Sequence, residues 1–145
     1  MQARPATVGD LEFVFRDLSK RIAEEYAAAG KDRKAAHDSL MMNMREGRAY
    51  ALVQNDHTVA IIAWHEDDGS VDTLFAAKDE FFSASTVRFC KRHIRRVQAV
   101  AGNLPIRSRI WFDRPEIRRW FRILGFVETG RENAAWVFEL APARE

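Results

Sequence analysis

The segment from Arg107 to Gly130 constrains the fold more than any other part of the chain. It predicts a strand over 106–112, a helix over 114–124 and a second strand that begins at Phe126. The predicted helix carries a one-sided apolar stripe made of Ile117, Trp120, Phe121 and Leu124. A strand, a helix and a strand in this order are typical of an α/β fold.

The rest of the sequence predicts a single α/β domain over residues 1–145. The predicted strands are 2–5, 48–53, 58–64, 71–76, 106–112, 126–128 and 135–140. The predicted helices run from Asp10 to a stop at Gly30 and over 32–46, 85–100 and 114–124. Either Thr7 or Asp10 caps the first helix, and Asn55-Asp56 and Asp67-Asp68-Gly69 predict turns between strands. The order β-α-α-β-β-β-α-β-α-β-β indicates a mixed central sheet flanked by about four helices.

Charge is distributed unevenly along the chain. The formal net charge is +2, but residues 88–122 carry eleven basic and two acidic side chains, a local excess of +9. Such a region suits an anionic cofactor, nucleic acid or an acidic protein partner. The single Cys90 excludes an internal disulfide, and no apolar run is long enough to span a membrane, so we expect a cytoplasmic protein.

The element order resembles that of the GCN5-related N-acetyltransferases, the GNAT family. The opening Ala3-Arg4-Pro5-Ala6-Thr7, followed by Asp10-Leu11, resembles the start of these enzymes, and Arg114 to Phe126 resembles their last helix. The resemblance spans nearly the whole chain. It implies a GNAT-like mixed sheet and, in an active enzyme, acetyl-CoA as the cofactor.

The places where the chemistry of this family concentrates differ here. The family has a glycine-rich loop that brings backbone N–H groups to the coenzyme pyrophosphate. In this chain the corresponding stretch, 77–86, has no glycine and contains Asp79 and Glu80, which would repel an anion. Phe121 stands where many members have a tyrosine that protonates the leaving thiolate, and a phenyl ring has no O–H. These losses predict a fold that is kept without its activity.

The same departures resemble the internal virion protein A family of short-tailed coliphages. The matching residues are Arg4-Pro5, Asp10, Phe13, Phe75, Lys91-Arg92, Trp111, Ile117, Arg118 and Gly125. This resemblance implies a non-catalytic structural or accessory protein of phage or prophage origin, present in the host cytoplasm and in the virion. Such a protein would need no cofactor and would bind a protein partner, such as a virion component, or nucleic acid through its basic helices.

Two functional interpretations therefore stay open, an active enzyme and a non-catalytic protein, and each depends on different residues. In an acetyl-CoA-dependent N-acetyltransferase, Glu66 or Asp72 is the candidate general base, although both also fit a solvated turn. The candidate cofactor-binding residues are Lys78, Ser83, Ala84, Ser85 and Thr86.

A non-catalytic protein would use its basic helices instead. The candidate partner-binding residues are Arg88, Arg92, Arg95, Arg96, Arg118 and Arg122, although they also fit a solvated basic surface. The four histidines lie far apart, and Cys90 falls on the apolar stripe of its helix. We therefore predict no metal site.

Overall fold

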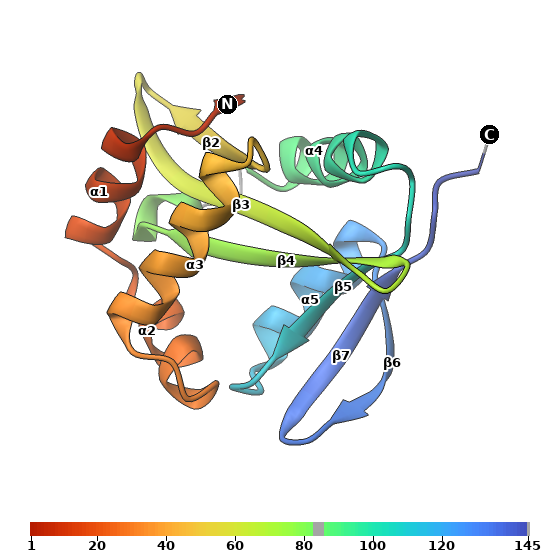
Figure 1. Ribbon diagram of the computed structural model, residues 1–145. Coiled ribbons are helices and arrows are strands. Elements are labelled where there is room, and N and C mark those ends of the chain that lie inside the picture. Colours follow the sequence, from red (N-terminus) through yellow and green to blue (C-terminus); the bar gives the residue numbers. More distant parts are fainter. Residues whose placement is uncertain (83–85, 145) are drawn as a thin grey trace. The chain divides into compact units, whose positions relative to one another are not determined.

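The computed structural model describes residues 1–82 and 86–144 (Figure 1). The strands are β1 (Gln2–Pro5), β2 (Ala49–Gln54), β3 (His57–Asp67), β4 (Ser70–Ala77), β5 (Ile106–Ile110), β6 (Val127–Glu132) and β7 (Ala135–Leu140). The helices are α1 (Val8–Arg16), α2 (Lys20–Ala28), α3 (Arg33–Arg45), α4 (Val87–Val100) and α5 (Pro115–Leu124), with a short 3-10 turn, η1 (Asp79–Phe82). Among these described helices, none is both long and apolar enough to cross a membrane.

The strands form one seven-stranded sheet in the order β1-β2-β3-β4-β5-β7-β6. β4 and β5 pair in parallel, with Val71 opposite Ile106 and Asp72 opposite Arg107. The pairs β1–β2, β2–β3, β5–β7 and β6–β7 are antiparallel. The sheet is therefore mixed, and the predicted α/β class and strand sequence are confirmed.

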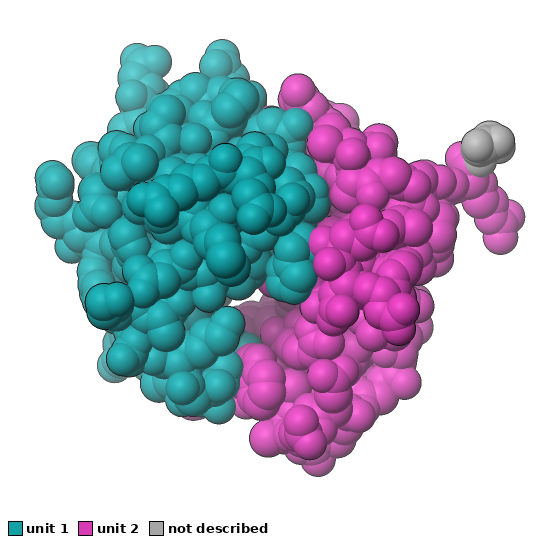
Figure 2. Space-filling model, viewed as in Figure 1, with its two compact units in different colours: residues 1–65, 74–86 teal, residues 66–73, 87–145 magenta. Residues whose placement is uncertain are grey.

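The described chain divides into two compact units, which Figure 2 colours separately. Unit 1 comprises Met1–His65 and Leu74–Thr86, and unit 2 comprises Glu66–Thr73 and Val87–Glu145. The core of unit 1 joins α1 and α3 to the sheet through Leu11, Val14, Phe15, Ala36, Leu40, Ala49, Ile61, Ala63 and Ala76. The buried apolar side chains of unit 2 include Val71, Ile94, Val97, Ile106, Ile110, Leu124, Phe126, Phe138 and Leu140.

The first predicted helix is in fact two helices, so the described chain has five α-helices rather than about four. α1 ends at Arg16 and α2 begins at Lys20. The chain leaves the helical path between them because the backbone N–H of Ser19, which is buried, donates a 2.8 Å hydrogen bond to the carbonyl of Ala77. A continuous apolar stripe cannot reveal this break, since the stripe continues into the second helix.

Local sequence signals place several turns and helix ends correctly. Thr7 is the N-cap of α1, and Asp10 completes a capping box with it, which decides between the two predicted caps. Asn55 and Asp56 both have positive φ, as a two-residue hairpin turn requires. Gly125 ends α5 with a φ of 101°, a conformation that favours glycine.

The closing hairpin is longer than the sequence predicted. β6 continues to Glu132, whereas the prediction ended this strand at 128 and placed Gly130 in the turn. A register shift between Glu128 and Gly130 lets the strand absorb the glycine as an irregularity and continue pairing with β7. The third predicted helix begins at Val87 as α4, while its predicted start at Ser85 lies outside the described residues.

Candidate functional site

Lys78 follows the end of β4, and its ammonium group is held inside unit 1. Nζ lies 4.1 Å from the centroid of the Phe13 ring, 3.8 Å from Glu80 Oε1 and 3.9 Å from Asp17 Oδ2. The side chain is only 10% exposed. An ammonium group between an aromatic face and two carboxylates is already compensated. Lys78 would have to leave these contacts before it could reach a phosphate.

Glu80 is engaged by a second partner, His57, which the sequence did not predict. His57 Nε2 lies 2.5 Å from Glu80 Oε2, and His57 Nδ1 lies 3.2 Å from the carbonyl oxygen of Asn55. Both partners, the Glu80 carboxylate and the Asn55 carbonyl, are hydrogen-bond acceptors, so the imidazole ring joins them. The hydrogen bond from His57 lowers the pKa of Glu80. Together with Gln54, these residues line a hollow of about 300 Å³.

Aromatic residues occupy the described part of the segment that replaces the glycine-rich loop. Phe81 is buried, and its ring centroid lies 5.3 Å from that of Phe82. The guanidinium of Arg21 lies over the Phe82 ring at 4.5 Å. Thr86 is fully buried at the end of the segment. The candidates Ser83, Ala84 and Ser85 lie outside the described residues, so the predicted cofactor-binding set remains a prediction.

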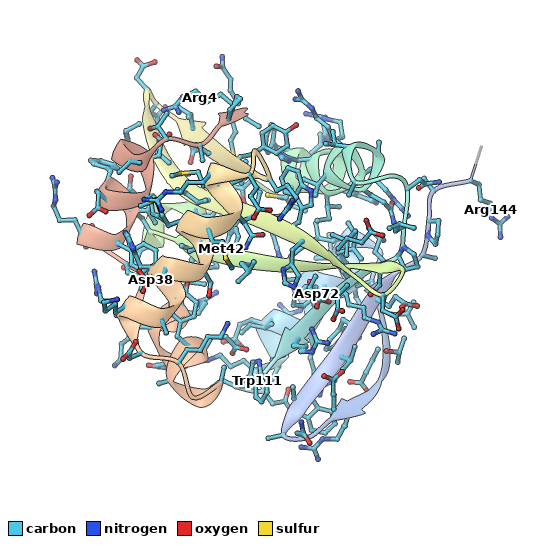
Figure 3. The ribbon with its side chains drawn as sticks, viewed as in Figure 1. Arg4, Asp38, Met42, Asp72, Trp111 and Arg144 are labelled. Atoms are coloured by element: carbon cyan, nitrogen blue, oxygen red, sulfur yellow. The ribbon has the colours of Figure 1, made fainter. Side chains whose placement is uncertain are left out.

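The two candidate general bases have different environments. Asp72 lies on β4 (Figure 3) with a side chain only 12% exposed, and its Oδ1 is 3.3 Å from Arg109 Nη1. Arg109 also contacts Glu132, with Nη2 3.2 Å from Oε2, so it links two carboxylates. Glu66 is exposed near the end of β3. The predicted solvated turn is therefore wrong for both residues, because Glu66 is exposed but lies within β3 and Asp72 is nearly buried on β4.

Phe121 has an apolar packing role in α5. Its ring stacks on Phe138 with centroids 5.2 Å apart and planes at 17°, and it meets Phe126 edge to face at 5.1 Å. Such aromatic pairs stabilise a fold by more than the burial of their apolar surface alone would. They account for an aromatic residue at this position without any role for a hydroxyl group.

Two of the candidate partner-binding arginines are held by other parts of unit 2. Arg95 donates hydrogen bonds to Gln98 Oε1 and to the carbonyl of Ala141, both at 2.8 Å. Arg118 donates to Asp113 at 2.6 Å and also to Glu128, and these carboxylate contacts raise its pKa. The other candidates, Arg88, Arg92, Arg96 and Arg122, are exposed.

The sequence did not predict a partly buried ionic network in unit 1, in which a half-exposed Arg4 meets a buried Asp10. Asp10 is 6% exposed and accepts hydrogen bonds from Arg4 at 2.6 and 2.8 Å, from Thr58 at 2.6 Å and from the backbone of Thr7 at 2.8 Å (Figure 3 labels Arg4). Burial alone would raise the pKa of Asp10, but these hydrogen bonds outweigh it and hold the pKa well below its usual value. The network ties β1 and α1 to β3.

No group of three or more His, Cys, Asp or Glu side chains in the described parts of the chain could hold a metal ion. Cys90 is buried on the apolar side of α4, as its place on the stripe predicted.

Comparison with known proteins identifies the fold. No protein-family model matches the sequence, and no curated protein matches it. The chain does match the solved structure of the PaiA N-acetyltransferase of Thermoplasma acidophilum in complex with coenzyme A, with a TM-score of 0.74, 11% identity and coverage of 97% of this chain and 98% of that one. The chain has the GNAT fold.

Two further solved structures agree with this assignment. One is a GNAT-family acetyltransferase of Streptococcus agalactiae, with a TM-score of 0.71, 9% identity and coverage of 99% of this chain and 96% of that one. The other is the GNAT domain of S. lividans PAT, with a TM-score of 0.70, 14% identity and coverage of 95% and 88%. At these identities the likeness shows the fold and not the activity.

Proposed function

We propose that this protein is an acyl-CoA-dependent N-acyltransferase, with acetyl-CoA as its donor and an atypical pyrophosphate-binding segment. The observation that carries the proposal is the match over 97% of the chain to an N-acetyltransferase solved with coenzyme A. Since a fold hosts many functions, the residues of this chain must supply the binding and the chemistry.

Acyl transfer needs a group that removes a proton from the acceptor amine. The amine nitrogen then bonds to the thioester carbonyl carbon, the C–S bond breaks, and the thiolate takes a proton from solvent, because Phe121 has none to give. We assign the base to Asp72 rather than to Glu66. Asp72 is buried and oriented by Arg109, whereas Glu66 lies in solvent.

Calorimetric titration with acetyl-CoA tests the proposal. We expect a dissociation constant of about 10 μM or lower, which at about 1 mM ligand would raise the free energy of unfolding by about 2.7 kcal/mol. ATP at the same concentration is the control, because it carries a similar charge without the pantetheine arm. Absence of heat and of a thermal shift with acetyl-CoA, or an equal response to ATP, would overturn the proposal.

Turnover tests the assignment of the base. Release of free thiol from acetyl-CoA is followed with a panel of primary amines as acceptors. We expect D72N to lower kcat by about 10²-fold or more, the scale of a lost general base, and E66Q to stay near the wild-type value. Equal losses in both variants, or none in D72N, would remove Asp72 from this role.

A non-catalytic protein that keeps the GNAT fold is the second candidate function, and specific contacts favour it. Lys78 and Glu80 are engaged within unit 1, and Phe121 is packed against two aromatic rings. The resemblance to internal virion protein A of short-tailed coliphages, and a phage origin, belong to this candidate. It predicts no acetyl-CoA binding and no thiol release with any amine, so the same two experiments decide between the candidates.

A further inference from the structure

We propose that the exposed face of α4 binds the phosphate backbone of double-stranded nucleic acid without regard to base sequence. This inference goes beyond acyl transfer and does not depend on it.

The face is a continuous row of cations on one regular element. Arg88, Lys91, Arg92, Arg95 and Arg96 follow the spacing i, i+3, i+4, i+7 and i+8, so they lie on one side of the helix, and all five are exposed. The helix contains no acidic residue. At about 1.5 Å per residue the row is about 12 Å long.

The opposite face fixes this row in place. Cys90, His93, Ile94 and Val97 are buried. Gln98, which is fully buried, donates through Nε2 to the carbonyls of Leu104, Leu140 and Ala141 at 3.0–3.3 Å. These contacts anchor α4 to the end of β7, so little ordering of the helix is needed when the cations meet a ligand.

Three cations of α4 differ from Arg109 and Arg118 in their partners. Arg109 and Arg118 each contact two carboxylates, which cancel their charge. Within the described ranges 1–82 and 86–144, Arg88, Lys91 and Arg92 form no ion pair. The charges of Arg109 and Arg118 are therefore compensated, whereas those of Arg88, Lys91 and Arg92 are available to a ligand.

α5 contributes a less suitable surface. Arg119 and Arg122 line a hollow of about 380 Å³ together with Arg118, Pro115 and Asp113. Asp113 and Arg118 form an ion pair in this hollow, so only Arg119 and Arg122 are left there to meet a phosphate. The proposed site is for this reason limited to α4.

The chemistry of the row favours a duplex over other polyanions. A protein partner is usually anchored by buried apolar or aromatic side chains, and the five positions of the row offer none. A single strand is bound by aromatic platforms on which its bases stack, and these are also missing from the row. About 12 Å of duplex axis carries about seven phosphates, enough for all five cations.

The inference is tested by measuring the affinity for a fluorescently labelled 24-base-pair DNA duplex. Fluorescence anisotropy gives this affinity at KCl concentrations between 50 and 200 mM. With five phosphate contacts, log Kobs should fall against log[KCl] with a slope of about −4.5. The variant R88Q/K91Q/R92Q should reduce this slope to about −1.8, at about 0.9 per contact. A matching RNA duplex should behave similarly, because the contacts are to phosphate.

A matched variant distinguishes the loss of these particular cations from the loss of three positive charges elsewhere on the protein. R16Q/K31Q/R45Q removes three exposed cations from unit 1, where they form no ion pair with other described residues, and it should leave the slope unchanged. An equal loss in both variants, a slope near zero in the wild type, or tighter binding of a 24-residue oligo-dT strand than of the duplex would overturn the inference. Binding to vesicles of phosphatidylcholine with phosphatidylserine, without binding to the duplex, would assign the face to membranes instead.

The melting temperature of R88Q/K91Q/R92Q shows whether this variant is folded. If it melts early, K91Q alone keeps the test decisive, since it should lower the slope by about 0.9. Failure of the acetyl-CoA titration would leave these outcomes unchanged, so the two proposals fail separately.

Discussion

Protonation of His93 should couple folding to pH. His93 lies on the buried face of α4 and is 5% exposed; burial, together with the nearby charge of Arg96, lowers its pKa from 6.5 to about 4. The unfolded chain therefore takes up a proton near pH 6.5, while the folded chain does not until about pH 4. The associated stability is complete above pH 6.5 and is lost as the pH falls toward 4.

The pKa difference sets the size of this effect. A difference of about 2.5 pH units corresponds to about 3 kcal/mol over the whole window, of which about 2 kcal/mol is lost between pH 7 and pH 5. Urea unfolding of the wild type and of H93Q at both pH values measures it. The other titrating groups are the same in both proteins, so they cancel in the comparison.

We expect the wild type to lose about 2 kcal/mol more than H93Q between these pH values. Equal losses would refute this coupling. If H93Q does not fold, the NMR titration of the His93 ring in the wild type decides, and an apparent pKa of 6.5 or higher contradicts the prediction.

Three substitutions test packing elsewhere by urea unfolding at pH 7. Asp10→Asn should lower the free energy of unfolding by about 1–3 kcal/mol, because it removes the charge of a buried carboxylate that accepts hydrogen bonds from a half-exposed Arg4, and a loss below about 0.5 kcal/mol would contradict this. Tyr26→Phe removes a 2.5 Å hydrogen bond to the Phe75 carbonyl and should cost about 1 kcal/mol, whereas no change would show that the bond does not stabilise the fold. Gly125→Ala should cost about 1–2 kcal/mol, because φ is 101° and the new Cβ would lie 3.3 Å from a leucine side chain; a stabilised variant would disagree with this geometry.

The sequence predicted those parts of the fold that local chemistry controls. The apolar stripe of α5, the positive-φ pair Asn55-Asp56 and the stop at Gly125 each act over a few residues, so one sequence is enough to recognise them. The break before α2 depends on a hydrogen bond from Ser19 to Ala77, far away in the chain. The spacing of apolar residues does not indicate such a distant hydrogen-bond partner.

The candidate site was less accessible to sequence reasoning. The types of residue were recognised, but their partners were not. The sequence shows the charge of Lys78 but not its partners, because Phe13 lies on α1 and Asp17 directly follows that helix, about 60 residues earlier in the chain. The Thr-x-x-Asp spacing from Thr7 to Asp10 is a local signal that could have revealed the capping box, although not the contribution of Arg4.

The basic residues show why it matters for function that the sequence reveals a residue's type but not its partners. In the sequence, Arg92 and Arg118 are equivalent members of one basic region. In the folded chain, Arg118 binds Asp113 and Glu128 and lies 4.7 Å from the Trp136 ring, so it fastens α5 to β6 and β7. A cation used in this way contributes to the fold and is costly to redirect toward a ligand, because its carboxylates would be left unpaired. Removing Arg92 leaves no carboxylate behind, and the same holds for Arg88 and Lys91, so the stability of the fold does not account for these three cations on α4.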